Sequence, residues 1–162
     1  MQFIQAEHDR WHRRESAETS APHLLPYAHA LLTLTQWQAV RDHWPAQFAV
    51  GVILPNDADV GALAGDLHRL SLVALQFPKW TDGRAYSQAR LLRVRHRFGG
   101  ELRATGAVLV DMLPLLRRCG FDSVALRADQ DLDTAREALG FFAGHYQGDT
   151  VQPQPIFQRE AA

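Results

Sequence analysis

The fold is decided between residues 48 and 78, which read FAVGVILPNDADVGALAGDLHRLSLVALQFP. Two nearly continuous apolar runs, residues 48–55 and 72–78, stand at its ends, and such runs suit strands that are covered on both faces. The apolar residues between them recur at helical spacing, at Val60, Leu63, Leu67 and Leu70. The stretch therefore predicts a parallel strand–helix–strand unit whose helix lies within residues 57–70.

The same alternation continues along the chain. The further predicted elements are a helix over about 83–97, a strand over 101–106, a helical stretch over 107–119, a strand over 121–127 and a helix over about 132–145. Pro114 removes a backbone hydrogen bond, so the third helical stretch is expected to form two short turns or to kink near Val110. Asp131 or Asp133 would cap the last helix. We expect an α/β protein of about four consecutive βα units, with a parallel sheet that is open or forms half of a barrel.

Three regions are expected: an N-terminal extension over residues 1–47, a core over 48–146 and an extended or disordered tail over 147–162. Within the extension, residues 2–14 predict a hairpin or a strand pair. Residues 16–23 predict a polar loop, and a short helix is expected to begin after Thr35. A half-barrel would expose two sheet edges, which favours a homodimer.

Charge and composition narrow the class of protein. The chain has 162 residues, of which 46% are hydrophobic, and a formal charge of −1, which gives no overall attraction for nucleic acid or an anionic membrane. Its longest apolar runs fall well short of the roughly 20 residues that span a bilayer. Charged residues interrupt the first 14 positions, where a signal peptide needs an apolar segment, so the cytoplasm is the expected location.

Motifs for cofactors and metals are not evident. A lone Cys119 cannot form an internal disulfide or hold an iron–sulfur cluster, and its place before Gly120 at a helix end predicts a packing role and a raised thiol pKa. The chain has no glycine-rich dinucleotide fingerprint, P-loop or nucleophile elbow. We expect no metal site, because His8 and His12 do not fit the zincin pattern and residues 129–140 fail as a calcium loop. Any cofactor stays unknown.

Polar residues follow the predicted strands, and the carboxyl ends of parallel strands meet at one edge, where such folds bind ligands. We call this edge the rim. Its most promising part is Asp82-Gly83-Arg84 at the start of a helix, where backbone N–H groups and Lys79 suit an oxyanion. The alternative is that Asp82 only caps the helix and Arg84 is a surface charge. The predicted rim residues are Lys79, Asp82, Gly83, Arg84, Ser87, Arg103, Thr105 and Asp111.

Arginines are concentrated between residues 84 and 103, where six of them accompany a single Glu101. Arginine suits carboxylate, phosphate or sulfate-like groups, so this region predicts an anion or an acidic protein as partner. The alternative is a solvated helix face. Arg103 lies within a predicted strand, so it must reach the rim or meet a carboxylate such as Asp111 or Asp122.

Several motifs also carry a family resemblance over residues 31–147. They are Asp82-Gly83-Arg84, Tyr86-Ser87, Ala89-Arg90, Leu92-Arg93, Gly100-Glu101-Leu102-Arg103-Ala104 and Arg118-Cys119-Gly120-Phe121-Asp122. In these motifs the chain resembles a bacterial family of unknown function whose members are identified as oxidoreductases of sulfite reduction and are typically encoded beside the sulfite reductase hemoprotein. Where the family pattern has Gly-Asp-Val, this chain has Gly106-Ala107-Val108. A catalytic role of that acid would be lost here.

The resemblance implies an oxidoreductase or accessory protein of assimilatory sulfite reduction. It would bind a small oxyanion, or a redox partner such as the sulfite reductase hemoprotein, at the rim. The alternative hypothesis is a non-catalytic dimeric interaction domain that docks an acidic protein through its arginine-rich helix. A barrel-like isomerase or lyase is a third hypothesis.

Overall fold

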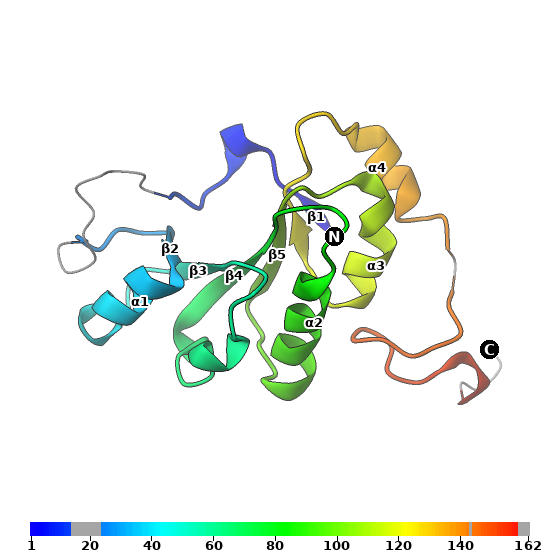
Figure 1. Ribbon diagram of the computed structural model, residues 1–162. Coiled ribbons are helices and arrows are strands. Elements are labelled where there is room, and N and C mark those ends of the chain that lie inside the picture. Colours follow the sequence, from blue (N-terminus) through cyan, green and yellow to red (C-terminus); the bar gives the residue numbers. More distant parts are fainter. Residues whose placement is uncertain (14–23, 143, 159–162) are drawn as a thin grey trace.

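The computed structural model describes residues 1–13, 24–142 and 144–158. It contains a single six-stranded parallel sheet in the order β1-β6-β5-β4-β3-β2, with helical segments between the strands (Figure 1). The strands are β1 Gln2–Phe3, β2 Ala30–Thr33, β3 Val50–Leu54, β4 Leu70–Phe77, β5 Glu101–Gly106 and β6 Ser123–Val124. The predicted α/β class with a parallel sheet is confirmed.

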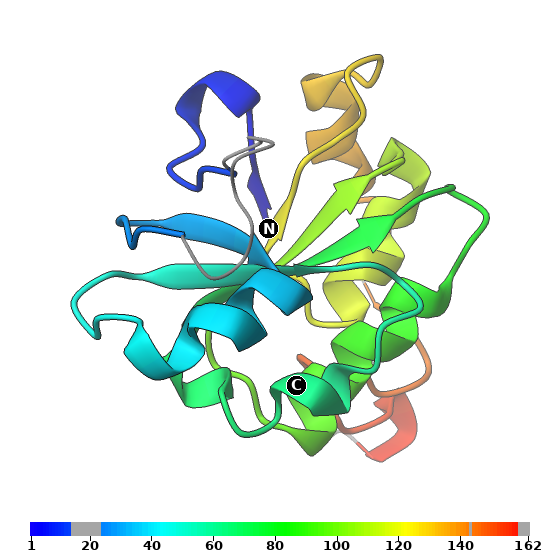
Figure 2. The ribbon, with the colours of Figure 1, turned by 60° about the vertical axis from the view of Figure 1, so that its left-hand side comes forward.

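From β2 to β6 the strands lie in the order of the sequence. Every crossover therefore moves in the same direction, and right-handed crossovers of that kind place all helices on one face. Figure 2 shows α1 Leu34–Val40, α2 Arg84–Arg90 and α3 Leu113–Arg118 on one side of the sheet and the N-terminal segment on the other. The arrangement is that of half a βα barrel.

The α-helices are short, and α1 and α4 begin at side-chain caps. Helix α1 begins at Leu34, earlier than predicted, because Thr33 and Gln36 form a capping box. Helix α4 Leu132–Ala138 is capped by Asp131, one of the two predicted residues, which accepts a hydrogen bond of 2.8 Å from Thr134 N. The remaining helical turns are η1 Ala6–His8, η3 Arg41–His43, η4 Val60–Leu63, η5 Leu67–Arg69, η6 Leu91–Arg95, η7 Val110–Met112 and η8 Ile156–Gln158.

The predicted helix over residues 57–70 is wrong, because the segment forms only the two 3₁₀ turns η4 and η5. Gly61 and Gly65 each lower helix stability by about 1 kcal/mol relative to alanine. In addition, the Asp59 carboxylate accepts a hydrogen bond from Gly61 N at 2.8 Å, a local bond that competes with a helix. The apolar spacing is nevertheless used, since Val60, Leu63 and Leu67 are all buried.

The other helices also differ from their predicted lengths. Helix α2 gives way at Leu91 to a π turn, η6, in which His96 N donates to Leu91 O at 3.0 Å. The predicted break at Pro114 is confirmed as two short elements, η7 and α3, with the proline in the first turn of α3. Helix α4 ends at Ala138, well before residue 145, and a turn follows in which Gly140 N donates to Glu137 O at 2.8 Å.

The predicted hairpin or strand pair over residues 2–14 is wrong, because its two ends pair with opposite edges of the sheet. Strand β1 pairs with β6, where Gln2 N donates to Asp122 O at 2.8 Å. His12 forms a parallel bridge to Ala30 of β2, and its N–H donates to His29 O at 3.0 Å. The predicted polar loop over residues 16–23 lies outside the described residues.

The pairing of the N-terminal segment with both edges of the sheet affects the argument for a homodimer. That prediction was based on two bare sheet edges, but β6 and β2 are both partly covered by residues 2–12 of the same chain. The sheet nevertheless stays open, with β1 and most of β2 at its two edges, and the homodimer stays a prediction.

The sheet has two unlike faces. On β4, Val73, Leu75 and Phe77 belong to the main core beneath the helices. Leu72 and Ala74 alternate with them and point to the opposite face, under the N-terminal segment. The strand register places one row of side chains across this second face, formed by Thr33, Ile53, Ala74, Arg103 and Ser123.

Candidate functional site

The rim is built around the junction of β4 and α2. Arg84, the first residue of α2, donates two hydrogen bonds to the Asp82 carboxylate, from Nε to Oδ1 at 3.0 Å and from Nη2 to Oδ2 at 2.8 Å. The hydrogen bond from Arg84 holds the pKa of Asp82 well below its usual range, and the neighbouring Asn56 amide contributes. The Arg84 charge is therefore balanced within the chain.

Gln88 fixes the position of this junction. Its side chain is buried, and Nε2 donates to Pro55 O at 2.9 Å and to Ala58 O at 2.8 Å. These bonds tie the second turn of α2 to the loop that follows β3. The rim is consequently held by a side chain that the sequence analysis did not single out.

A second arginine on the rim is balanced in the same way. Arg127, which follows β6, donates from Nε to Asp129 Oδ1 at 2.5 Å and from Nη2 to Asp129 Oδ2 at 2.6 Å. The hydrogen bond from Arg127 lowers the pKa of Asp129 to about 2. Arg84 and Arg127 are thus each paired with a carboxylate of the same chain, which weakens the attraction of the rim for an external anion.

The predicted rim residues lie in three places. Asp82, Gly83, Arg84 and Ser87 lie together at the start of α2, with exposed Lys79 in the preceding loop. Thr105 lies beside Gln76 near the ends of β5 and β4. Arg103 is buried in mid-strand, and Asp111 lies in η7 and lines a pocket beside α3. Oxyanion binding at the rim stays a prediction.

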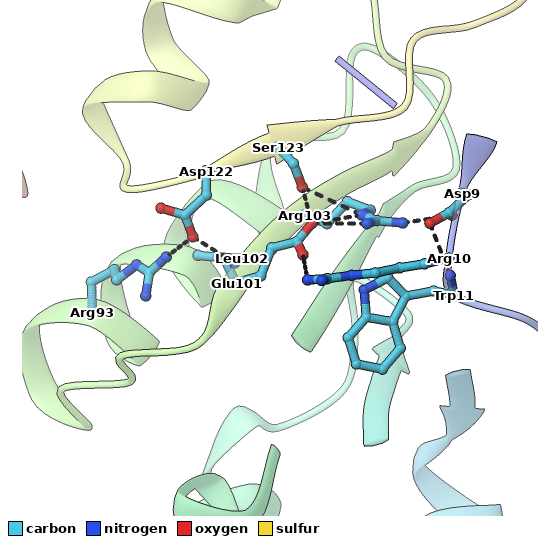
Figure 3. A network of polar contacts seen from close by, with 9 residues as sticks. All are labelled: Asp9, Arg10, Trp11, Arg93, Glu101, Leu102, Arg103, Asp122 and Ser123. Carbon is cyan, nitrogen blue, oxygen red and sulfur yellow. Dashed lines mark hydrogen bonds and ion pairs between the residues drawn. The ribbon is translucent and has the colours of Figure 1, made fainter. Parts of the chain in front are cut away.

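Arg103 lies at the centre of a polar network on the sheet face opposite the helices (Figure 3). Its guanidinium donates from Nη1 to Asp9 Oδ2 at 2.6 Å and from Nη2 to Glu101 Oε1 at 2.8 Å. Ser123 Oγ also donates to Glu101 Oε1, at 2.5 Å. The expectation that Arg103 meets a carboxylate is confirmed, but the suggested partners Asp111 and Asp122 are wrong. The network fastens the N-terminal segment across the sheet.

Arg93 forms a second network, in which Asp122 is its acidic partner (Figure 3). Its Nε donates to Gly120 O at 2.9 Å and its Nη1 to Gly100 O at 2.9 Å. The Asp122 carboxylate also accepts from Leu102 N at 2.7 Å. Arg93 therefore joins α2 to the turns that precede β5 and β6, and it serves the fold.

Three of the six arginines remain. Arg90, Arg95 and Arg97 are exposed and have no ion pair with any described residue. Exposed Leu91 and Val94 lie between them on the same helical segment. We call these five residues the arginine face of α2, although only Arg90 lies in α2 itself and the face continues through η6 to Arg97. The positive charge of this face was predicted from the sequence, but the exposure of Leu91 and Val94 was not.

Cys119 is packed into the main core and is only 4% exposed. Burial raises the pKa of its thiol, against the opposing charges of Arg90 and Arg118, so the predicted direction is confirmed. We expect Cys119 to react with dithionitrobenzoate at least about 100-fold more slowly in the native protein than in concentrated urea, because the thiol is exposed only by unfolding. Absorbance at neutral pH measures the rate. Equal rates in the two conditions would contradict the packing role.

Two features are absent from the described part of the chain. Among residues 1–13, 24–142 and 144–158, no three His, Cys, Asp or Glu side chains come together as metal ligands would. No helix in these same ranges is long and apolar enough to cross a membrane.

Comparison with known proteins gives one family. No curated protein shows significant similarity to the chain. A family model described as "Bacterial protein of unknown function (DUF934)" matches residues 51–157, from β3 to η8. Because this match spans well over half of the chain, the protein belongs to the DUF934 family of bacterial proteins of unknown function.

Proposed function

We propose that this protein is an accessory component of assimilatory sulfite reduction that docks an acidic protein partner through the arginine face of α2. The observation that carries the proposal is the contrast among the six arginines of residues 84–103. Arg84, Arg93 and Arg103 are neutralised inside the chain, whereas Arg90, Arg95 and Arg97 have no carboxylate among the described residues. These three arginines form a local positive charge on a chain whose formal net charge is only −1.

The chemistry of the arginine face suits a protein better than a small ion. Leu91 is 42% exposed and Val94 is 64% exposed, so apolar surface separates the charges. A hollow of about 330 Å³ beside it is lined by Leu91 and Arg95 of η6, by His96, and by Asp59 and Val60 at the start of η4. Arginine and apolar side chains around a hollow are typical of protein interfaces, where arginine is enriched and an apolar anchor fills a pocket.

The family resemblance suggests which partner to test. Residues 77–126 resemble proteins that are encoded beside the sulfite reductase hemoprotein, and we therefore propose that hemoprotein as the acidic partner. The proposal requires positioning and charge complementarity, and it requires no cofactor in this chain. Electron transfer to the hemoprotein would come from a further donor.

Charge reversal on the arginine face is expected to weaken hemoprotein binding by about 10-fold or more, because like charges at an interface repel and slow association. The variant is Arg90→Glu with Arg95→Glu. Binding to the purified hemoprotein of the same bacterium is measured by titration calorimetry at low and at raised salt. The control is Arg136→Glu, which reverses an exposed charge on α4. Absence of binding at low salt, or equal affinity of the double variant, would overturn the docking proposal.

Growth tests whether the docking serves sulfur assimilation. Deleting the gene is expected to slow growth on sulfate as the sulfur source and to leave growth on cysteine normal. The wild-type gene and the Arg136→Glu control should restore growth on sulfate, whereas the double variant should not. Normal growth of the deletion strain on sulfate would contradict a required role in sulfite reduction.

A further inference from the structure

A pocket of about 500 Å³ lies between α3 and the residues that follow α4. One wall comes from η7 and α3, and the other comes from residues within 139–142 and 144–152. Thr150 fastens this second wall, since its N and Oγ1 both donate to Arg118 O, at 3.2 Å and 2.8 Å. The pocket has the size of a small-molecule site and lies apart from the arginine face.

Asp149 organises one end of the pocket. Its side chain is 5% exposed, and Oδ1 accepts from Val151 N at 2.8 Å and from Gln152 N at 2.6 Å. The other oxygen lies 2.5 Å from His145 Nε2. Burial opposes ionisation of Asp149, but the two N–H groups and His145 outweigh it and lower its pKa. Two backbone N–H groups therefore hold the carboxylate, and it lies beside His145, whose Nε2 is buried without a hydrogen bond to any described residue.

The same end carries Arg117 and Arg118, and Arg118 is only loosely paired with Asp149. Arg118 Nε is buried without a hydrogen bond to any described residue, and the nearest oxygen of Asp149 is 3.8 Å away. Arg117 also lines the pocket and has no ion pair within the described residues. A buried donor without an acceptor is costly, and an anionic ligand oxygen would supply the missing acceptor.

The middle of the pocket is apolar. Leu115 is 46% exposed, Phe142 72% and Val151 67%, and these side chains line it together with Leu139. Large apolar side chains that are left open to water around a concave site mark a place where a ligand buries them.

Asp111 lines the pocket two helical turns before Arg118, roughly 10 Å along the axis at 1.5 Å per residue. It has no ion pair with any described residue. A ligand that carried a second negative charge at the far end of an apolar chain would approach this carboxylate and be repelled.

We propose that this pocket binds a small organic acid with one negative charge and an apolar body. The anionic group lies against Arg117, Arg118 and His145, and the apolar body lies against Leu115 and Val151. Neither the fold nor docking at the arginine face requires such a pocket, so the proposal stands independently of both.

Hexanoate, adipate and sulfate separate the parts of this proposal. Titration calorimetry of the full chain is expected to show saturable binding of hexanoate at a single site. Adipate, which adds a second carboxylate, should bind about 10-fold more weakly or worse. Sulfate, which lacks an apolar body, should not displace hexanoate. Absence of hexanoate binding, equal binding of adipate, or displacement by sulfate would each overturn the proposed ligand class.

Two variants locate the binding. Arg118→Gln is expected to reduce hexanoate affinity about 10-fold or more, since it removes the charge that meets the carboxylate. Leu115→Glu changes an exposed position of α3, so it tests the pocket even where Arg118→Gln fails to fold, and it should abolish binding. Arg136→Gln on α4 is the matched control. Unchanged hexanoate affinity in Leu115→Glu would place the site elsewhere and overturn the proposal.

Discussion

Replacing Arg103 with alanine is expected to lower the free energy of unfolding by about 3–5 kcal/mol, the range measured when one partner of a buried ion pair is removed. The Arg103 side chain is 5% exposed and lies between the carboxylates of Asp9 and Glu101, which are themselves only 21% and 16% exposed. Without the guanidinium, two poorly solvated negative charges face each other across the sheet. Urea denaturation followed by circular dichroism measures the loss.

The matched control for this prediction is Arg10→Ala. Arg10 belongs to the same network, but its side chain is 66% exposed and lies 3.7 Å from Glu101. Exposed pairs contribute about 0–1 kcal/mol, so this variant should unfold almost like the wild type. A loss below about 1 kcal/mol for Arg103→Ala would show that the network does not hold the N-terminal segment in place.

Arg93→Ala is expected to lower the free energy of unfolding by about 3 kcal/mol or more, because it leaves several partly buried acceptors without a donor. Arg93 is 16% exposed and donates to three backbone carbonyls as well as to Asp122. Thermal and urea unfolding measure the change. Arg95→Ala, two residues later, should alter stability by less than about 0.5 kcal/mol, because Arg95 is exposed.

Comparing the stability of Arg93→Ala with that of Arg95→Ala tests whether only some arginines of this segment support the fold. If Arg93→Ala and Arg95→Ala had equal effects on stability, the division of the segment into structural and free arginines would be wrong. The docking proposal would then lose its main support.

The sheet could be predicted from the sequence because its central strands are buried on both faces. The apolar runs at residues 48–55 and 72–78 contain β3 and most of β4, and no helix-period pattern competes there. The predicted helix over residues 57–70 is wrong, because the two 3₁₀ turns η4 and η5 bury the same regularly spaced apolar side chains that an α-helix would bury. Strand β2 was not predicted, because the whole strand contains only the four residues Ala30–Thr33.

The roles of the arginines could not be assigned from sequence. Arg103 is held by Asp9, a residue 94 positions away, and no local pattern announces that contact. Arg93 and Arg95 belong to the same helical segment, and their different roles depend on which of them faces Gly100 and Gly120. The apolar members of the arginine face were visible in the sequence, but helical spacing alone does not tell an exposed Val94 from a buried one.

The pairing of the N-terminal segment with both edges of the sheet also constrains how the protein folds. Gln2 pairs with Ser123, near the other end of the described fold, so this contact closes one of the longest loops available to the chain. Contacts of high sequence separation form late and slow folding. On the ribosome, β1 cannot pair until β6 has emerged, and Asp9 lacks its ion-pair partner until Arg103 has emerged. Residues 2–9 are synthesised before the segments that they contact, and they are therefore among the last of the described residues to reach their final places.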